Sequence, residues 1–214
     1  RQAIAYAINN QDIVDSIYNG SATVATSPIP KITTGHNENS NPYTQNIEKA
    51  KELLAEAGYP NGFDIVLNVN EDNQRVDTAV VIQDNLKAIG VNVQIKTYQW
   101  ASYVAFVENP SQEKGMFLMA WNIANDDPDE LLYPLYHSSQ IDAHTNVVFY
   151  KNEDFDNLIS KGRETVDKEK RIDLYKKAQD IIQEELPHYA ILYPMQNFAY
   201  KKNIKGIEVN KRGY

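Results

Sequence analysis

The sequence predicts an α/β fold in which a mixed β-sheet is flanked by helices. Apolar side chains alternate with polar ones over residues 63–69 and again over 91–98, the pattern of half-buried strands. Residues 74–89, which lie between them, carry apolar side chains at helical spacing. A strand, a helix and a strand with short joints form a βαβ unit, so the two strands should be parallel. Residues 116–121 are a continuous apolar run, typical of a strand covered on both faces.

The segment before this unit is predicted to be helical at both ends and irregular in the middle. Residues 2–9 place apolar side chains on one helical face, and Asn10 can cap a second helix that stops at Gly20. Residues 21–46 are rich in Ser, Thr, Asn and Pro, which predicts a long loop with at most one short extended piece. Residues 46–58 begin with Asn and end with Gly, which predicts the next helix.

The C-terminal part of the chain is mainly helical by pattern. Residues 129–137 favour a short helix, and an apolar stripe that starts at Phe155 marks another. The longest helix is predicted over residues 168–186, where a proline ends it. Residues 189–200 favour one or two strands interrupted by a proline.

Length and composition limit the size and the class of the protein. The chain has 214 residues, 42% of them hydrophobic and 23% charged, enough for one sizeable core or at most two small domains. It holds no cysteine, which excludes disulfides, zinc–thiolate sites and a cysteine nucleophile. The net charge of −8 argues against nucleic acid and against an anionic membrane surface as partners.

The densest charge feature is an acidic cluster of Asp126, Asp127, Asp129 and Glu130. It fails the test for a calcium-binding loop, because Glu130 stands where that loop needs glycine. Three interpretations remain open: the carboxylates stabilise the loop and the helix start, they contact a ligand, or they serve a metal or catalysis.

Other catalytic signals are weak. The sequence has no glycine-rich phosphate loop and no Gly-x-Ser-x-Gly motif. Ser138 and Ser139 follow a histidine, but neighbours on a chain rarely face each other usefully. No two of the four histidines stand at the short sequence spacing that is typical of metal ligands; they are His36, His137, His144 and His188. An enzyme is therefore unsupported, and a carboxylate-dependent hydrolase that uses residues 126–130 is the competing class.

The two tryptophans lie where predicted strands end. Trp100 follows the second strand of the βαβ unit, and Trp121 ends the apolar run. Strand ends in α/β sheets border the crevice in which ligands bind. Since tryptophan is also a common core residue, pocket lining and a core position both remain open.

Several segments, taken in order, resemble the family-5 extracellular solute-binding proteins, which are the oligopeptide, dipeptide and nickel receptors of ABC importers. The opening RQAIAYAINNQDIV carries the first similarity. The resemblance continues, with matching spacing, through residues 47–59, 86–93, 100–103, 119–121, 127–129, 170–179 and 203–209.

The resemblance implies a type II periplasmic-binding-protein-like fold of two lobes that enclose the ligand. Residues 1–214 are expected to be a single α/β lobe, the second of the two, so the first lobe and the signal and lipobox segment lie outside this chain. The implied function is capture of a peptide or other small solute and delivery to ABC permease subunits, with no enzymatic step and no cofactor. A nickel or metallophore receptor is the alternative within the family. The implied location is the extracellular face of the membrane, with a lipid anchor, or the periplasm.

Site residues follow from the resemblance by position. In peptide-binding members a Trp-x-x-Asp motif supplies a carboxylate for the peptide amino group, and alignment on Trp121 places Ala124 at that position. Ammonium capture could therefore shift to Asp126 or Asp127. No metal ligand and no catalytic residue is assigned. The expected ligand-binding residues, on one exposed face, are Trp100, Trp121, Ala124, Asn125, Asp126 and Asp127.

Overall fold

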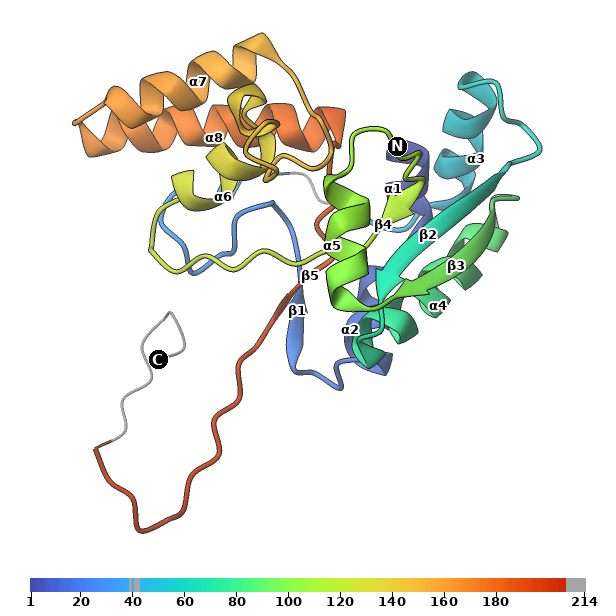
Figure 1. Cartoon of the computed structure of the whole chain (residues 1–214), viewed down its shortest axis with the longest axis horizontal. Coiled ribbons are helices and arrows are strands. Elements are labelled where there is room, and N and C mark those ends of the chain that lie inside the picture. Colours follow the sequence, from blue (N-terminus) through green and yellow to red (C-terminus); the bar gives the residue numbers. More distant parts are fainter. Residues whose placement is uncertain (39, 41–42, 207–214) are drawn as a thin grey trace.

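The structure of the chain, a computed structural model, describes residues 1–38, 40 and 43–206 (Figure 1). The predicted α/β fold with a sheet flanked by helices is confirmed. In chain order the elements are α1 Gln2–Ala7, α2 Asn10–Ser16, β1 Ala22–Val24, α3 Ile47–Glu56, β2 Asp64–Asn70, α4 Asn73–Lys87, β3 Asn92–Tyr98, α5 Trp100–Glu108, β4 Met116–Phe117, α6 Asp129–Tyr136, the 3-10 helix η1 Ser138–Gln140, α7 Glu153–Glu164, α8 Lys168–Glu185 and β5 Leu192–Pro194.

The βαβ unit forms as predicted. Strands β2 and β3 pair in parallel along their full length, and α4 connects them. The Asp72 side chain accepts a hydrogen bond from the Arg75 backbone N–H at 3.0 Å, which caps the start of α4. Gly62 has a φ of +76°, and a Cβ at this position would lie 1.9 Å from the carbonyl oxygen of Gly90. Only glycine therefore allows the turn before β2 to approach the turn between α4 and β3 this closely.

The prediction of a strand over residues 116–121 is correct for the first two residues and wrong for the rest. Strand β4 ends at Phe117, and Met119 and Trp121 are each 41% exposed. β4 is an outer strand of the three-stranded sheet, whose order is β3-β2-β4, and the chain then leaves the sheet toward α6 (Figure 1). Within the described residues the apolar run therefore has no second covering layer, although its composition is that of a doubly covered strand.

Two further elements differ from those predicted from the sequence. Helix α5 follows β3 at once, whereas the sequence pattern predicted no helix there. In the range 189–200 the only described strand is β5, which ends at Pro194 and pairs antiparallel with β1. Parallel and antiparallel pairing thus occur in separate sheets. β1 is the short extended piece predicted within the long loop.

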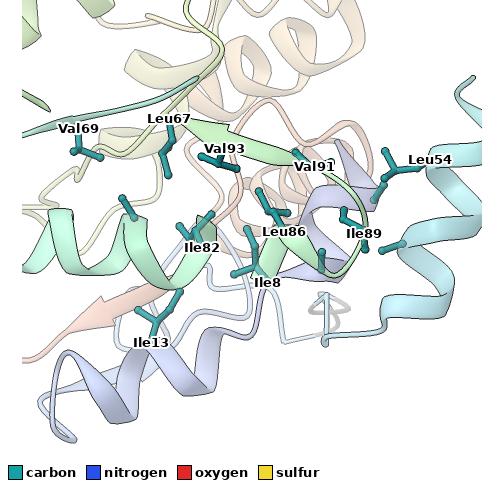
Figure 2. Close-up of a cluster of buried hydrophobic side chains, with 14 residues drawn as sticks. Ile8, Ile13, Leu54, Leu67, Val69, Ile82, Leu86, Ile89, Val91 and Val93 are labelled. Atoms are coloured by element: carbon teal, nitrogen blue, oxygen red, sulfur yellow. The ribbon is translucent and has the colours of Figure 1, made fainter. Parts of the chain in front are cut away.

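Buried apolar side chains form two clusters in the described part of the chain. The first lies between the parallel sheet and the helices α1 to α4, and Figure 2 shows Leu67 and Val93 of the strands above Ile82 and Leu86 of α4. The second joins α6, α7 and α8. Burial of such side chains contributes roughly 1.5–3 kcal/mol each, so both clusters stabilise the fold.

Polar and aromatic contacts tie the second cluster to the loop after β1 and to β4. Gln179 of α8 is fully buried and hydrogen-bonds to the loop after β1, through the Ser27 hydroxyl at 2.7 Å and the Gly35 carbonyl at 2.7 Å. The His188 ring lies 6.4 Å from Phe117 of β4 and 5.2 Å from Tyr136 of α6. The single lobe over residues 1–214 stays a prediction, and residues 207–214 fall outside the described range. Among the described helices, none is both long and apolar enough to cross a membrane.

Candidate functional site

The segments that follow the three parallel strands leave the sheet at one edge. Asn70, the last residue of β2, lies opposite Tyr98, the last residue of β3, and β4 runs parallel to β2 on its other side. We call this edge the carboxyl edge; it comprises residues 70–72, 98–100 and 118–121. In open α/β sheets, ligands bind in the crevice outside such an edge.

A buried tyrosine holds the carboxyl edge together. Tyr103 of α5 is fully buried, and its hydroxyl lies 3.3 Å from the Asn68 carbonyl and also donates to the Leu118 carbonyl. The Asn68 side chain accepts a hydrogen bond from the Tyr98 hydroxyl at 3.0 Å and donates to the Met116 carbonyl at 3.0 Å. All three strand ends are therefore fixed relative to α5.

Both tryptophans are exposed, so the interpretation of them as core residues is wrong. Trp100 begins α5 with 52% of its surface exposed, and its ring lies 6.2 Å from Tyr103. Trp121 is 41% exposed, and its indole N–H donates to the Glu130 carbonyl at 3.0 Å. Each indole is thus held on one side by the fold and is open to a partner on the other.

The first half of the acidic cluster is bonded to distant parts of the chain. The Asp126 carboxylate accepts hydrogen bonds from the Thr34 backbone N–H at 2.5 Å and from its hydroxyl at 2.9 Å. Asp127 forms an ion pair with Arg171 of α8 at 2.9 Å and accepts the Asp129 backbone N–H at 2.9 Å. These carboxylates therefore anchor the loop between β4 and α6 to the rest of the fold.

The second half of the cluster has the same role. Asp129 accepts the Tyr175 hydroxyl at 2.9 Å and lies 3.5 Å from the Arg163 guanidinium. Burial, together with the bond to Asp129, raises the pKa of Tyr175. Glu130 accepts the Asn125 backbone N–H at 2.5 Å. The loop and helix-start interpretation of the cluster is therefore confirmed, and no three His, Asp or Glu side chains gather for a metal within the described residues.

The remaining residues expected at the site are less constrained. Ala124 is half-buried and Asn125 is exposed. Ligand contact by any residue of the expected set stays a prediction, as does their placement on one face.

The sequence pattern missed Arg75, which also reaches the carboxyl edge. Its guanidinium lies 5.7 Å from the Trp100 ring, and Nη1 donates to the Asn70 side chain at 2.6 Å. The residue is half-buried, and none of the ion pairs among the described residues involves it. A cation in the first turn of a helix is unfavourable, because it lies at the positive end of the helix dipole. Its occurrence there in the sequence could have marked Arg75 as a candidate functional residue.

The expectation that His137 does not face its serine neighbours is wrong. The Ser139 hydroxyl lies 2.9 Å from His137 Nδ1, and this nitrogen also accepts the Ser139 backbone N–H at 3.2 Å. His137 thereby caps η1, and its Nε2 lies 3.3 Å from the Ser160 hydroxyl. The contact is a local turn motif on the surface, at the start of a short helix.

Solved structures share the overall fold of this chain. A periplasmic binding protein from Helicobacter pylori, solved in complex with the peptide STSA, superposes with a TM-score of 0.85 at 37% identity over 91% of this chain. A dipeptide binding protein from Pseudoalteromonas, solved with Met-Leu, superposes with a TM-score of 0.86 at 30% identity over 92% of this chain. The fold is therefore that of a periplasmic-type binding protein.

The chain belongs to the bacterial extracellular solute-binding proteins, family 5, because residues 1–143 match the middle region of that family. It is 33% identical to heme-binding protein A of Haemophilus influenzae and 32% identical to the dipeptide-binding protein of Escherichia coli, both over 100% of this chain. It spans 40% of the length of each of these relatives. It covers 38% of the Helicobacter chain and 39% of the Pseudoalteromonas chain.

Proposed function

We propose that this chain is part of the substrate-binding component of an ABC importer, which captures peptides outside the membrane and delivers them to permease subunits. The observation that carries the proposal is the similarity, over 100% and 99% of this chain, to relatives named dipeptide-binding and oligopeptide-binding proteins. The carboxyl edge supports it, because two half-exposed indoles lie there on a fixed scaffold. The whole protein works at the extracellular face with a lipid anchor, or in the periplasm.

In this proposal residues 1–214 form one lobe, and the ligand is enclosed between it and a first lobe of the same polypeptide. Supporting evidence comes from the segment after β5, which extends away from the helices and strands in Figure 1. Its exposed apolar side chains suit burial against another surface, and they are Met195, Phe198, Tyr200 and Ile204.

The ligand on this lobe contacts the two tryptophans and the loop that begins at Ala124. Asp126 and Asp127 act in the proposal mainly by holding that loop, because their carboxylates already accept hydrogen bonds from the fold. No catalytic role is proposed, since the acidic side chains that a hydrolase would need are bonded in the same way. NikZ from Campylobacter jejuni, solved in complex with Ni(L-His), shares the fold with a TM-score of 0.83, but its 24% identity supports no assignment of a ligand to this chain.

The test compares this chain with the complete polypeptide that contains it. A mixture of random tetrapeptides is titrated into each by calorimetry. We expect micromolar or tighter binding by the complete protein and no measurable binding by residues 1–214. One lobe supplies about half of the contacts but bears the full association entropy of roughly 4–15 kcal/mol. Absence of peptide binding by the complete protein, or peptide cleavage by either, would refute the proposal.

A further inference from the structure

We propose that Thr34 is a positioning residue for peptide binding, which fixes the loop that contacts the ligand without touching the ligand itself. The inference rests on the proposed function, in which the ligand lies against the two tryptophans and the loop that begins at Ala124. We call residues 121–128, between β4 and α6, the ligand loop. The inference starts from the bonds between this loop and Thr34, which lies 92 positions before Asp126 in the chain.

The ligand loop is partly closed by bonds to the helix that directly follows it. The Trp121 indole N–H donates to the Glu130 carbonyl at 3.0 Å, and the Asn125 backbone N–H donates to the Glu130 carboxylate at 2.5 Å. Both bonds end in the first turn of α6. They shape the loop locally, so contacts with more distant parts of the chain must hold its middle in place.

Thr34 supplies such a contact close to the expected ligand-binding residues. Asp126 lies two residues after Ala124, and its carboxylate accepts the Thr34 backbone N–H at 2.5 Å and the Thr34 hydroxyl at 2.9 Å. Two donors on one carboxylate fix its orientation as well as its position, and hydrogen bonds to a charged acceptor are stronger than neutral ones. The ion pair of Asp127 with Arg171 holds the loop one residue further from Ala124.

The segment that carries Thr34 is itself firmly held. A Cβ added at Gly35 would lie 3.1 Å from the ring of Pro128, so the backbone at this position packs directly against the end of the ligand loop. The Gly35 carbonyl also accepts the side chain of Gln179, which is fully buried in α8, at 2.7 Å. Thr34 thus connects the ligand loop to a fixed support. Because Thr34 is exposed, its replacement leaves the core packing unchanged.

A loop that is already in place loses little conformational freedom when the ligand binds. Without the Thr34 hydroxyl the loop can take up other positions, and binding must then restore the right one, which lowers affinity. The opposite result is expected if Asp126 binds the ammonium group of a peptide directly. Removal of the hydroxyl would then release one bond from the carboxylate, and affinity would stay the same or rise.

The test uses the complete polypeptide that contains this chain, titrated with a mixture of random tetrapeptides by calorimetry. Thr34→Val, which removes only the hydroxyl bond, should weaken binding roughly 5- to 20-fold. Thr34→Ser keeps the hydroxyl and should bind within about twofold of wild type. Asp126→Ala should lose at least as much affinity as Thr34→Val, and the double variant should bind as Asp126→Ala does, since both changes break one contact.

The matched control is Thr44→Val, the same change at an exposed position before α3, which should bind as wild type does. The urea midpoint of Thr34→Val should stay within about 0.3 M of wild type, because the residue is exposed. A larger fall would overturn the inference, since the affinity would then report a distorted lobe.

Three binding results would overturn the positioning role and leave peptide capture intact. They are unchanged or tighter binding by Thr34→Val, binding by Thr34→Ser as weak as by Thr34→Val, and a further loss when Thr34→Val is added to Asp126→Ala. If wild type does not bind the peptide mixture, the proposed function fails and the positioning role fails with it.

Discussion

Replacement of Gln179 by Met should destabilise the protein more than the same replacement at an exposed position of a helix. The side chain is fully buried in α8 and hydrogen-bonds to the loop after β1. Its Oε1 accepts the Ser27 hydroxyl at 2.7 Å and the Asn37 N–H at 3.2 Å, and its Nε2 donates to the Gly35 carbonyl at 2.7 Å. Methionine fills a similar volume but offers none of these bonds.

The magnitude follows from the groups left behind. The Ser27 hydroxyl still accepts the Ile29 N–H, but its proton loses the acceptor that Gln179 supplies, and the Gly35 carbonyl loses its donor. Each buried polar group without a partner costs about 1–3 kcal/mol, so the free energy of unfolding should fall by about 2–6 kcal/mol for the two groups. The same loop carries Thr34, which donates two hydrogen bonds to Asp126 in the proposed ligand-binding loop. Peptide affinity of the complete protein should therefore fall as well.

The assay is equilibrium unfolding in urea, followed by circular dichroism. Gln74→Met is the matched control, because it makes the same chemical change at an exposed position of α4 and should alter stability by less than about 0.5 kcal/mol. A loss below about 1 kcal/mol in Gln179→Met would show that the buried network does not stabilise the loop, and the reasoning would be refuted.

Three further predictions concern pH, backbone and binding. Burial lowers the pKa of His188 to about 4, so the unfolded chain takes up the proton first and stability falls as the pH drops from 6.5 toward 4. Urea midpoints across this range should decline in wild type and decline less in His188→Phe; equal slopes would contradict the prediction. Gly62→Ala should lower the free energy of unfolding by about 2 kcal/mol or more beyond the loss in Gly58→Ala. Both glycines have positive φ, but of the two only Gly62 has backbone atoms where the added Cβ would lie. Similar melting temperatures of the two variants would contradict this prediction. Trp100→Ala should weaken peptide binding by the complete protein about tenfold. Because Trp100 is 52% exposed, the free energy of unfolding should change by less than about 1 kcal/mol. Unchanged affinity in calorimetry together with a large loss of stability in urea would instead make Trp100 a core residue.

The structure shows that the acidic cluster holds a loop in place, which its composition alone does not reveal. Asp126 meets a loop residue that is 92 positions away, and Asp127 meets α8 across 44 positions. Carboxylates that accept several hydrogen bonds from the fold are held in a fixed place, which suits a structural clamp. A set of acidic side chains beside a tryptophan is thus compatible with a binding site in which most of those side chains never touch the ligand.

The sequence by itself determined the elements whose signals are local. The βαβ unit follows from apolar periodicity over residues 63–98, and the longest helix from its stripe and from Pro187. Helix caps are equally local, as Asn46 shows by accepting the Lys49 N–H three residues on. The family resemblance was also readable, because it depends on the order and spacing of residues along the chain.

Tertiary structure alone decided which side chains are available at the carboxyl edge. The apolar run after β4 looked buried, yet Trp121 is exposed because no second layer covers it in the described part of the chain. Arg75 reaches the edge because β2 and β3 end side by side, which brings Asn70 and Trp100 to it. The physical reason is that burial and pairing depend on partners far apart in sequence, and only the packed fold brings those partners within hydrogen-bond distance.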